Sequence, residues 1–285
     1  MPGRCQATVV MESVDSVHLE LEARPHSPSI VRAVLGGVGQ ARALAPELLD
    51  DLRTAVSEAC NNVVLHAYGD DGGPLCVDLR IAEEAIEVDV LDRGRGIRRL
   101  SPPDDAHMGL GLSVMAALAD RAEFREREHG GTQVHLSFRR ETGGPHRVTG
   151  ASADAPGAPQ LTGDLIVELP AELLGSVLAP VARGWAAIER LPVDRLAHVS
   201  SVVEAVCALA AGSVGDRVRF AITTSPSELE LAVAPFAAGT LHPDGASDGL
   251  ATLSGLALGV RVQTGAGWQT LLVSVALPAS ERAAS

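Results

Sequence analysis

Residues 57–68 read "SEACNNVVLHAY" and continue a helical pattern that begins at Pro46, since proline suits the first turn of a helix. Side chains four residues apart share one helix face, so Glu58, Asn62 and His66 form a polar stripe on an otherwise apolar segment. Such a stripe is typical of a surface helix that meets water. Whether it belongs to a site depends on the motifs around it.

The composition describes a folded chain whose partners are not nucleic acids. The 285 residues are 46% hydrophobic and 21% charged, which suits one large domain or two ordinary ones. A net charge of −13 leaves no basic surface to neutralise phosphates. The start of the chain lacks a signal peptide's apolar region and no apolar run reaches membrane-spanning length, so we expect a cytoplasmic protein without a membrane partner.

The four cysteines match neither a metal site nor a disulfide framework. Cys60 and Cys207 lie in apolar helical stretches, and we expect them to be small core residues.

The spacing of apolar and polar residues, together with turn-forming Gly, Pro and Asp residues, predicts a strand, two helices, two strands, a loop, a helix and two strands over residues 17–138. This order predicts an α+β fold, a two-layer α/β sandwich with helices on one face of a mixed sheet.

The same element order then starts again. Residues 141–163 are rich in Gly, Pro, Ala, Ser and Thr and read as a linker. A strand follows at 165–171, and the pattern closes with a short helix at 249–259 and a last strand. We therefore expect an internal duplication. The predicted segments are an N-terminal extension (1–16), a first domain (17–140), the linker (141–163) and a second domain (164–280).

Two glycine-rich motifs in the first domain have the chemistry of a nucleotide site. In "DRGRG", Asp92 can accept a hydrogen bond from an amino group such as that of adenine, and Gly94 and Gly96 let backbone approach a ligand. "GLGL", residues 109–112, is predicted to open a helix, whose free N–H groups and positive dipole end suit phosphates.

The polar stripe supplies the remaining groups. The Asn62 amide oxygen is a hard ligand suited to Mg²⁺, and Glu58 could take a proton from a hydroxyl or a water. Asn61 is interpreted as a bystander or a supporting donor, and His66 as a packing or hydrogen-bonding residue.

Together these motifs resemble the GHKL family of ATPases and kinases. "EACNN" (58–62) looks like its N box, "DRGRGI" (92–97) like its first glycine box, "MGLGL" (108–112) like its second, and "GGT" (130–132) like its late Gly-Thr. The resemblance covers about residues 17–138, and "HAY" with a short lid at 98–108 is most similar to the anti-sigma-factor serine kinases.

The resemblance implies a histidine-kinase-like ATPase domain that uses ATP and Mg²⁺ to phosphorylate a serine on an anti-anti-sigma protein and that sequesters a sigma factor. It implies Glu58 as the catalytic residue and Asn62 as the Mg²⁺ ligand. The implied ATP-binding residues are Asn62, Asp92, Gly94, Gly96, Gly109, Leu110, Gly111, Leu112 and Thr132.

The second domain is expected to be a degenerate copy that does not bind ATP. Pro192 and Glu204 are twelve residues apart, as Pro46 and Glu58 are, which places Ala208 at the position of Asn62. The glycine boxes become "APFAAGT" and "GLATL", without a carboxylate at the expected place.

Other GHKL classes fit less well. A two-component histidine kinase needs a helical hairpin before the ATPase domain, and only about sixteen residues precede the first strand. The clamp enzymes use a lysine, and all 23 basic residues here are arginine. The open alternative is a nucleotide-binding regulator without kinase activity. The resemblance also implies that single-domain relatives work as homodimers, so we expect a monomer in which the two domains pair about an approximate two-fold axis.

Overall fold

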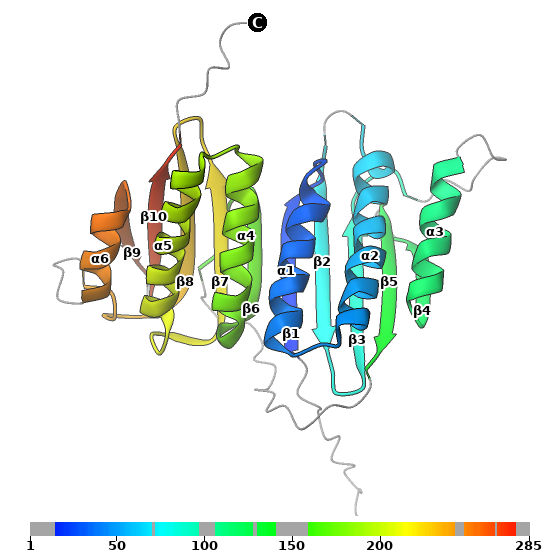
Figure 1. Ribbon diagram of the computed structural model, residues 1–285, viewed down its shortest axis with the longest axis horizontal. Coiled ribbons are helices and arrows are strands. Elements are labelled where there is room, and N and C mark those ends of the chain that lie inside the picture. Colours follow the sequence, from blue (N-terminus) through cyan, green and yellow to red (C-terminus); the bar gives the residue numbers. More distant parts are fainter. Residues whose placement is uncertain are drawn as a thin grey trace, which may run out of the picture.

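A single ten-stranded sheet, covered by helices on one face, runs through the whole molecule (Figure 1). The computed structural model describes residues 15–69, 72–96, 106–127, 130–140, 159–242, 248–265 and 267–277. The strand order is β4-β5-β3-β2-β1-β6-β7-β8-β10-β9. We refer to residues 15–140 as the first half and to residues 159–277 as the second half.

The first half contains β1 (Asp15–Glu22), α1 (Ser27–Ala41), α2 (Pro46–Asn62), the π-helix η1 (Val63–Ala67), β2 (Pro74–Ile81), β3 (Ala85–Asp92), α3 (Ala106–Leu118), β4 (Arg121–Glu126) and β5 (Thr132–Arg139). The second half contains β6 (Leu165–Pro170), the short 3-10 helix η2 (Ala171–Leu173), α4 (Leu174–Ile188), α5 (Val193–Ala210), β7 (Val214–Thr224), β8 (Glu228–Ala237), α6 (Asp248–Leu256), β9 (Gly259–Thr264) and β10 (Trp268–Ala276). The predicted order of elements in the first half is confirmed.

Two expectations about the sheet were wrong. The sheet is not mixed, because every strand pair within the described residues is antiparallel. The crossover through α3 does make β3 and β4 parallel, but β5 lies between them. The second half also has a strand, β9, between the predicted helix at 249–259 and the last strand, where the sequence predicted none; α6 ends at Leu256, and "GVRVQT" pairs with β10.

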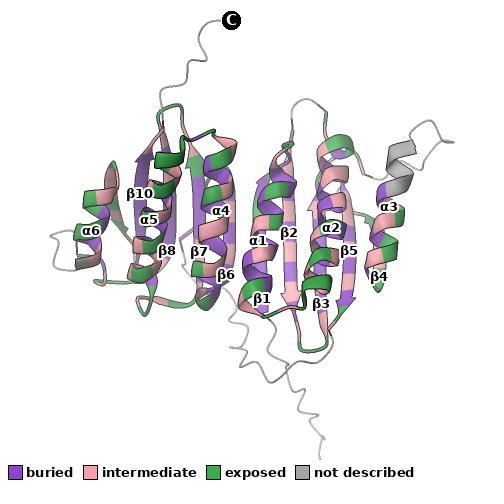
Figure 2. Ribbon diagram, viewed as in Figure 1, coloured by how far each residue is buried: buried purple, intermediate pink, exposed green. Residues whose placement is uncertain are grey.

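The core lies between the helices and one face of the sheet. Buried and less buried residues alternate along strands such as β2 (Figure 2), and the buried strand residues form one core cluster with buried residues of α1, α2, α4 and α5. The largest fully buried side chains include Phe138, Phe220 and Phe236. None of the helices in the described residues is both long and apolar enough to cross a membrane.

The same hydrogen bonds recur in the turns of the two halves. In the turn after α1, the Leu44 N–H donates to the Gly39 carbonyl, and in the turn after α4 the Leu191 N–H donates to the Ala186 carbonyl. Within these turns, Ala43 has a φ of 47° and Arg190 has a φ of 55°. These two are the only non-glycine residues with positive φ in the described chain. The two turns therefore match residue by residue, with Leu44 and Leu191 as counterparts.

The strand hairpins repeat in the same way. The Ala82 N–H donates to the Ala85 carbonyl, and the Ser225 N–H donates to the Glu228 carbonyl, so Ala82 and Ser225 are counterparts. At the ends of α3 and α6, the Ala119 N–H donates to the Met115 carbonyl as the Ala257 N–H donates to the Leu253 carbonyl. These helices and strand hairpins therefore have counterparts in the other half, and the match in numbering shifts in the connections and within β8, at its register shift against β10.

The two halves meet through β1 and β6, which pair antiparallel. Leu19 lies opposite Val77 of β2, and Val167 lies opposite Phe220 of β7. Val77 and Phe220 correspond in the hairpin match, so Leu19 and Val167 are counterparts. These two residues also lie opposite each other. A residue that faces its own counterpart in an antiparallel pair defines an approximate two-fold axis.

Helices α1 and α4 pack against each other beside this axis (Figure 1). Gly37 lies so close to α4 that an added Cβ would be 2.8 Å from the Cα of Val177 and closer still to the Ser176 carbonyl. Its counterpart Gly184 faces Ile30, with 3.7 Å between an added Cβ and the Ile30 Cδ1. The joint is therefore a tight helix contact as well as a strand pair.

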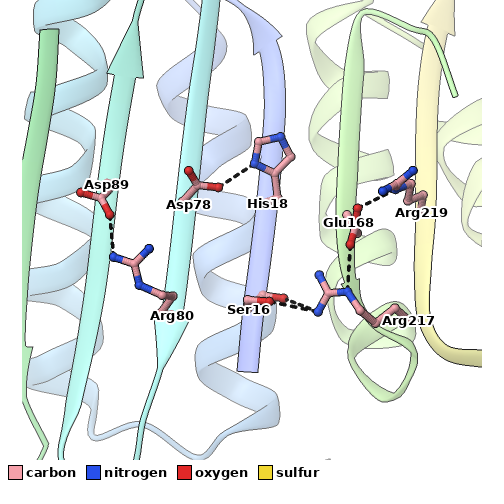
Figure 3. A network of polar contacts seen from close by, with 8 residues as sticks. All are labelled: Ser16, His18, Asp78, Arg80, Asp89, Glu168, Arg217 and Arg219. Atoms are coloured by element: carbon pink, nitrogen blue, oxygen red, sulfur yellow. Dashed lines mark hydrogen bonds and ion pairs between the residues drawn. The ribbon is translucent and has the colours of Figure 1, made fainter. Parts of the chain in front are cut away.

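Polar side chains connect the halves on the open face of the sheet (Figure 3). Arg217 of β7 donates to Glu168 of β6 and, through a second nitrogen, to the Ser16 carbonyl and hydroxyl on β1. On the helical face, Arg42 forms ion pairs with Asp15 and with Glu172.

Candidate functional site

Helix α2 presents the predicted polar stripe to α3. Glu58 and Asn62 both face Gly111: a Cβ added there would be 3.1 Å from Glu58 Oε2 and 3.6 Å from Asn62 Oδ1. Gly111 itself is buried, while Glu58 and Asn62 are half-buried. The absence of a side chain at Gly111 leaves two oxygen atoms converging on one small space. The structure therefore brings together three residues that the sequence predicted for one site.

Helix α3 begins earlier than the sequence predicted. It starts at Ala106, so the "GLGL" motif lies one turn inside the helix and does not open it. The N–H groups without a helical partner belong to the first four residues, which end at Gly109. The reason is local: Ala106, His107 and Met108 are all compatible with helical backbone.

Several of the predicted positions are described only in part. Gly109 and Leu110 are placed as helical backbone alone, and the lid residues 98–105 lie outside the described part of the chain. Leu112 is half-buried and packs against the core.

The first glycine motif forms a tight loop at the end of β3. Asp92 is 3% exposed, and one of its carboxylate oxygens accepts a hydrogen bond of 2.7 Å from the Gly94 N–H. Among the described residues, nothing donates to the other oxygen of Asp92. A Cβ on Gly94 would lie 2.6 Å from the carbonyl carbon of Ala67, so only glycine fits there. Gly96 has a φ of +72°, which also favours glycine.

The start of β5 closes the same end of the sheet. Gly131 has a φ of +90°, and an added Cβ would lie 2.8 Å from the Cα of Arg93. Thr132 follows it and is half-buried, one residue before Gln133, which lies opposite Leu91 of β3. Thr132 is therefore next to Asp92 at the edge of the loop.

Three residues that the sequence did not single out hold this loop. The Ala67 carbonyl accepts the Arg95 N–H at 3.0 Å, the Tyr68 hydroxyl accepts the Arg93 N–H at 2.7 Å, and Arg127 donates to the Asp92 carbonyl at 3.0 Å. The only sequence signal was "HAY" at 66–68, which carried no assigned role for its tyrosine. His66 is exposed.

Burial changes the acidity of two groups near α2. It raises the pKa of the Cys60 thiol to about 12, so this cysteine is a core residue, as predicted, and not a nucleophile. Burial also raises the pKa of the Tyr68 phenol, because it outweighs the opposing hydrogen bond from Arg93.

The corresponding place in the second half is apolar. The starts of α2 and α5 match, since the Leu49 N–H donates to the Ala45 carbonyl as the Leu196 N–H donates to the Pro192 carbonyl. Counting along the helices from these bonds places Leu209 at the position of Asn62. Gly249, the counterpart of Gly111 in α6, faces Leu209, with 2.9 Å between an added Cβ and the Leu209 Cδ1.

This matching corrects the sequence alignment by one residue. Pro192 corresponds to Ala45, not to Pro46, so Ala208 is not the counterpart of Asn62. The counterpart of Glu58 is Ala205, and Glu204 is an exposed residue at the position of Ser57. Cys60 and Cys207 become counterparts.

The region of the second half that corresponds to the first glycine box also differs from it. The hairpin match, extended along β3 and β8, reaches Pro235 and Phe236 at the position of Asp92, where β8 shifts its register against β10, and neither residue carries a carboxylate. Nearby, the buried Gln269 side chain accepts the Leu241 N–H at 2.8 Å and donates to the Leu241 carbonyl at 2.9 Å, which fixes the fully buried Leu241 beside the strand end.

Comparison with known proteins agrees with the geometry of the first half. The family described as "Histidine kinase-like ATPase domain" matches residues 21–138. The serine-protein kinase RsbW of Bacillus pumilus is 36% identical over 128 residues, which are 39% of this chain and 79% of that protein. The chain belongs to the GHKL superfamily, in its group of anti-sigma-factor serine kinases.

Further relatives match a similar share of the chain. RsbW of Bacillus subtilis is 32% identical over 139 residues, which are 44% of this chain and 86% of that protein. A crystal structure of the RsbU and RsbW domains of Rv1364c from Mycobacterium tuberculosis is 25% identical, with a TM-score of 0.36, and the match covers 45% of this chain and 32% of that one. The family thus accounts for the first half and implies that it uses ATP.

Proposed function

We propose that the first half is an ATP–Mg²⁺-dependent serine/threonine protein kinase that acts as an anti-sigma regulatory factor. The observation that carries this proposal is the convergence of Glu58 Oε2 and Asn62 Oδ1 on Gly111 of α3. The relatives RsbW of the two Bacillus species are serine-protein kinases, and the histidine kinase-like ATPase family matches residues 21–138 of this half. By the same resemblance, the substrate is an anti-anti-sigma protein and the second partner is a sigma factor.

The residues at the site fit a magnesium ion that nucleotide phosphates help to hold. The described residues contain no group of three or more His, Cys, Asp or Glu side chains that could hold a metal ion by themselves. Mg²⁺ is commonly bound by one or two protein oxygens together with phosphate oxygens and water. Asn62 would supply such an oxygen, and the bound ion would neutralise charge on the transferred phosphoryl group.

The other predicted residues have separate roles. Glu58 would accept the proton of the attacking serine hydroxyl, and the half-buried Asn62 would hold the metal end of the nucleotide. The buried carboxylate of Asp92 is oriented by Gly94 and would accept the adenine amino group, with Thr132 beside it. Gly96, Gly109, Leu110, Gly111 and Leu112 would complete the ATP-binding set.

The kinase proposal is tested by radiolabel transfer from ATP to a co-encoded serine-bearing partner. Glu58→Gln should keep ATP binding and lose turnover by about 10²–10⁴-fold, the usual contribution of a general base. Asn62→Leu, which copies the second half, should lose the Mg²⁺ dependence of nucleotide binding. Glu204→Gln is the matched control, because this exposed glutamate lies on the corresponding helix of the second half.

One outcome would favour the alternative reading. If Glu58→Gln transfers phosphate at the wild-type rate, or if the wild-type protein binds ATP but transfers none, the first half is a nucleotide-binding regulator without kinase activity.

We also propose that the second domain, residues 164–280, is a degenerate copy of the first, residues 17–140, and takes the place of a second subunit. The recurring hydrogen bonds and the pairing of Leu19 with its counterpart Val167 support this. Leu209 at the position of Asn62, and Pro235 and Phe236 around the position of Asp92, support one nucleotide site per chain. Light scattering should give a mass near 29.5 kDa, and a mass near twice that value would contradict the proposal.

A further inference from the structure

Tyr68, the only tyrosine in the chain, joins three separate segments at the candidate adenine end of the site. Its hydroxyl donates to the Pro74 carbonyl at the start of β2 at 2.6 Å and accepts the Arg93 N–H at 2.7 Å. Its ring lies against Gly73, where an added Cβ would be 2.5 Å from the ring Cδ1. The tyrosine therefore ties the end of η1 to β2 and to the glycine loop.

The segment that delivers this tyrosine is specific to the first half. Leu49 and Leu196 are counterparts in the helices, and Ala82 and Ser225 are counterparts in the hairpins that follow. The chain is longer between Leu49 and Ala82 than between Leu196 and Ser225, so the first half has additional residues in this connection. Here it contains the π-helix η1, whereas α5 ends at Ala210, shortly before β7 begins at Val214. Single-turn π-helices occur frequently at functional sites.

The additional residues act on the backbone of the glycine loop. Three consecutive N–H groups of this loop are each bonded: Arg93 to the Tyr68 hydroxyl, Gly94 to the Asp92 carboxylate, and Arg95 to the Ala67 carbonyl at 3.0 Å. The first and third acceptors come from the segment just after α2. The position of Asp92 relative to α2, which carries Asn62, is therefore set through Tyr68 and Ala67.

We propose that Tyr68 is a positioning residue for nucleotide binding, which orients the Asp92–Gly96 loop toward the adenine of ATP. This inference rests on the proposed function, because it concerns the same site. Tyr68 acts through the loop and does not touch the phosphates, so it should affect adenine nucleotides as a class and leave the Mg²⁺-dependent step unchanged.

The test uses Tyr68→Phe in the full chain, with ADP and ATP as probes. The phenylalanine keeps the ring against Gly73 and removes the hydroxyl, which leaves the Arg93 N–H and the Pro74 carbonyl without their partner. The expected result is a loss of affinity of about tenfold for both nucleotides, the effect of losing the one hydrogen bond, from the Arg93 N–H, that ties the glycine loop to Tyr68. The ratio of Kd with and without Mg²⁺, and kcat at saturating ATP, should stay at the wild-type values.

Ser225→Ala is the matched control for general destabilisation. The Ser225 hydroxyl also binds one carbonyl and one N–H, both of Glu228, at 3.0 and 3.1 Å, but it lies in the hairpin of the second half. This variant should bind ADP like the wild type. Tyr68 is the only tyrosine, and both tryptophans lie in the second half, so the ultraviolet difference spectrum gives a second measurement: ADP should produce a signal that is absent in Tyr68→Phe, and inorganic tripolyphosphate should produce none.

The outcomes separate the two proposals. Wild-type affinity for ADP in Tyr68→Phe, an equal loss in Ser225→Ala, or a fall in kcat with unchanged Kd would overturn the role of Tyr68 while leaving the kinase proposal intact. A wild-type protein that binds no ADP would overturn the proposed function, and this inference with it.

Discussion

The contact between α1 and α4 leads to a prediction about two glycines that occupy corresponding positions in the two halves. Gly37 and Gly184 occupy corresponding positions in α1 and α4, and each faces the opposite helix. Replacing a glycine by alanine inside a helix normally stabilises the protein by about 1 kcal/mol, because alanine loses less backbone entropy. The two sites should nevertheless respond with opposite sign.

The magnitude follows from what an added methyl group would meet. At Gly184 the Cβ would be 3.7 Å from the end of the Ile30 side chain, an ordinary contact, so Gly184→Ala should raise stability by about 1 kcal/mol. At Gly37 the Cβ would be 2.8 Å from the Cα of Val177 and closer to the Ser176 carbonyl. Backbone atoms cannot rotate away, so the helices must separate, and overpacking of this kind costs about 3 kcal/mol. After the gain in helix propensity, Gly37→Ala should be about 2 kcal/mol less stable than the wild type.

Chemical denaturation at equilibrium measures the difference directly. We expect about 3 kcal/mol between the two variants, seen as a shift in the midpoint at a constant m-value. If Gly37→Ala is as stable as Gly184→Ala, α1 and α4 do not pack this closely. The proposal that the second half takes the place of a subunit then loses the support of this helix contact.

Three further predictions concern single groups. Asp92→Asn should weaken ADP binding by about 1–3 kcal/mol in calorimetric titration, since it removes a charged acceptor, and unchanged affinity would exclude Asp92 from the site. The hydrogen bond to Asp78 raises the pKa of His18 above 6.5, so the pair's contribution to stability is complete below pH 6.5 and is lost as the pH rises through the folded-state pKa. Asp78→Asn should therefore flatten this part of the plot of stability against pH, and an unchanged plot would exclude the pair as its cause. Cys60, with a pKa of about 12, should resist alkylation at about pH 8 in the folded protein and react once it is denatured, as mass spectrometry would show.

The sequence predicted most of the first half because its signals were local. The hydrophobic period, the proline at the start of α2 and the glycine-rich loops depend on neighbouring residues only. The grouping of Glu58, Asn62 and Gly111 was also predictable, because the motifs that contain them lie on two helices that the sequence predicted. The antiparallel sheet was not predictable in this way, because the position of β5 between β3 and β4 is a long-range property.

The contacts of Tyr68 could not be predicted from local sequence patterns. Its two hydrogen bonds reach Pro74 and Arg93, six and 25 residues away, and no periodic pattern marks such contacts. The π-helix that precedes it was read as the last turn of α2, because the same residues suit either helix type.

The alignment of the two halves predicted from the sequence differs from the one that the structure gives. Matching Pro46 with Pro192 seemed natural because both begin helices and both precede a glutamate by the same interval. In the structure, however, Pro46 is the first residue of α2, while Pro192 is the N-cap of α5. The two prolines therefore occupy helix positions that differ by one residue, although their spacing to the glutamate is the same. A shift of one residue rotates a helical position by about 100°, which takes Glu204 off the face that Glu58 occupies. The face that replaces it presents Ala205 and Leu209, and these apolar residues can bind neither a metal ion nor a proton. The second half therefore has neither polar group of the stripe, and Glu204 lies off the helix face that Glu58 occupies in the first half.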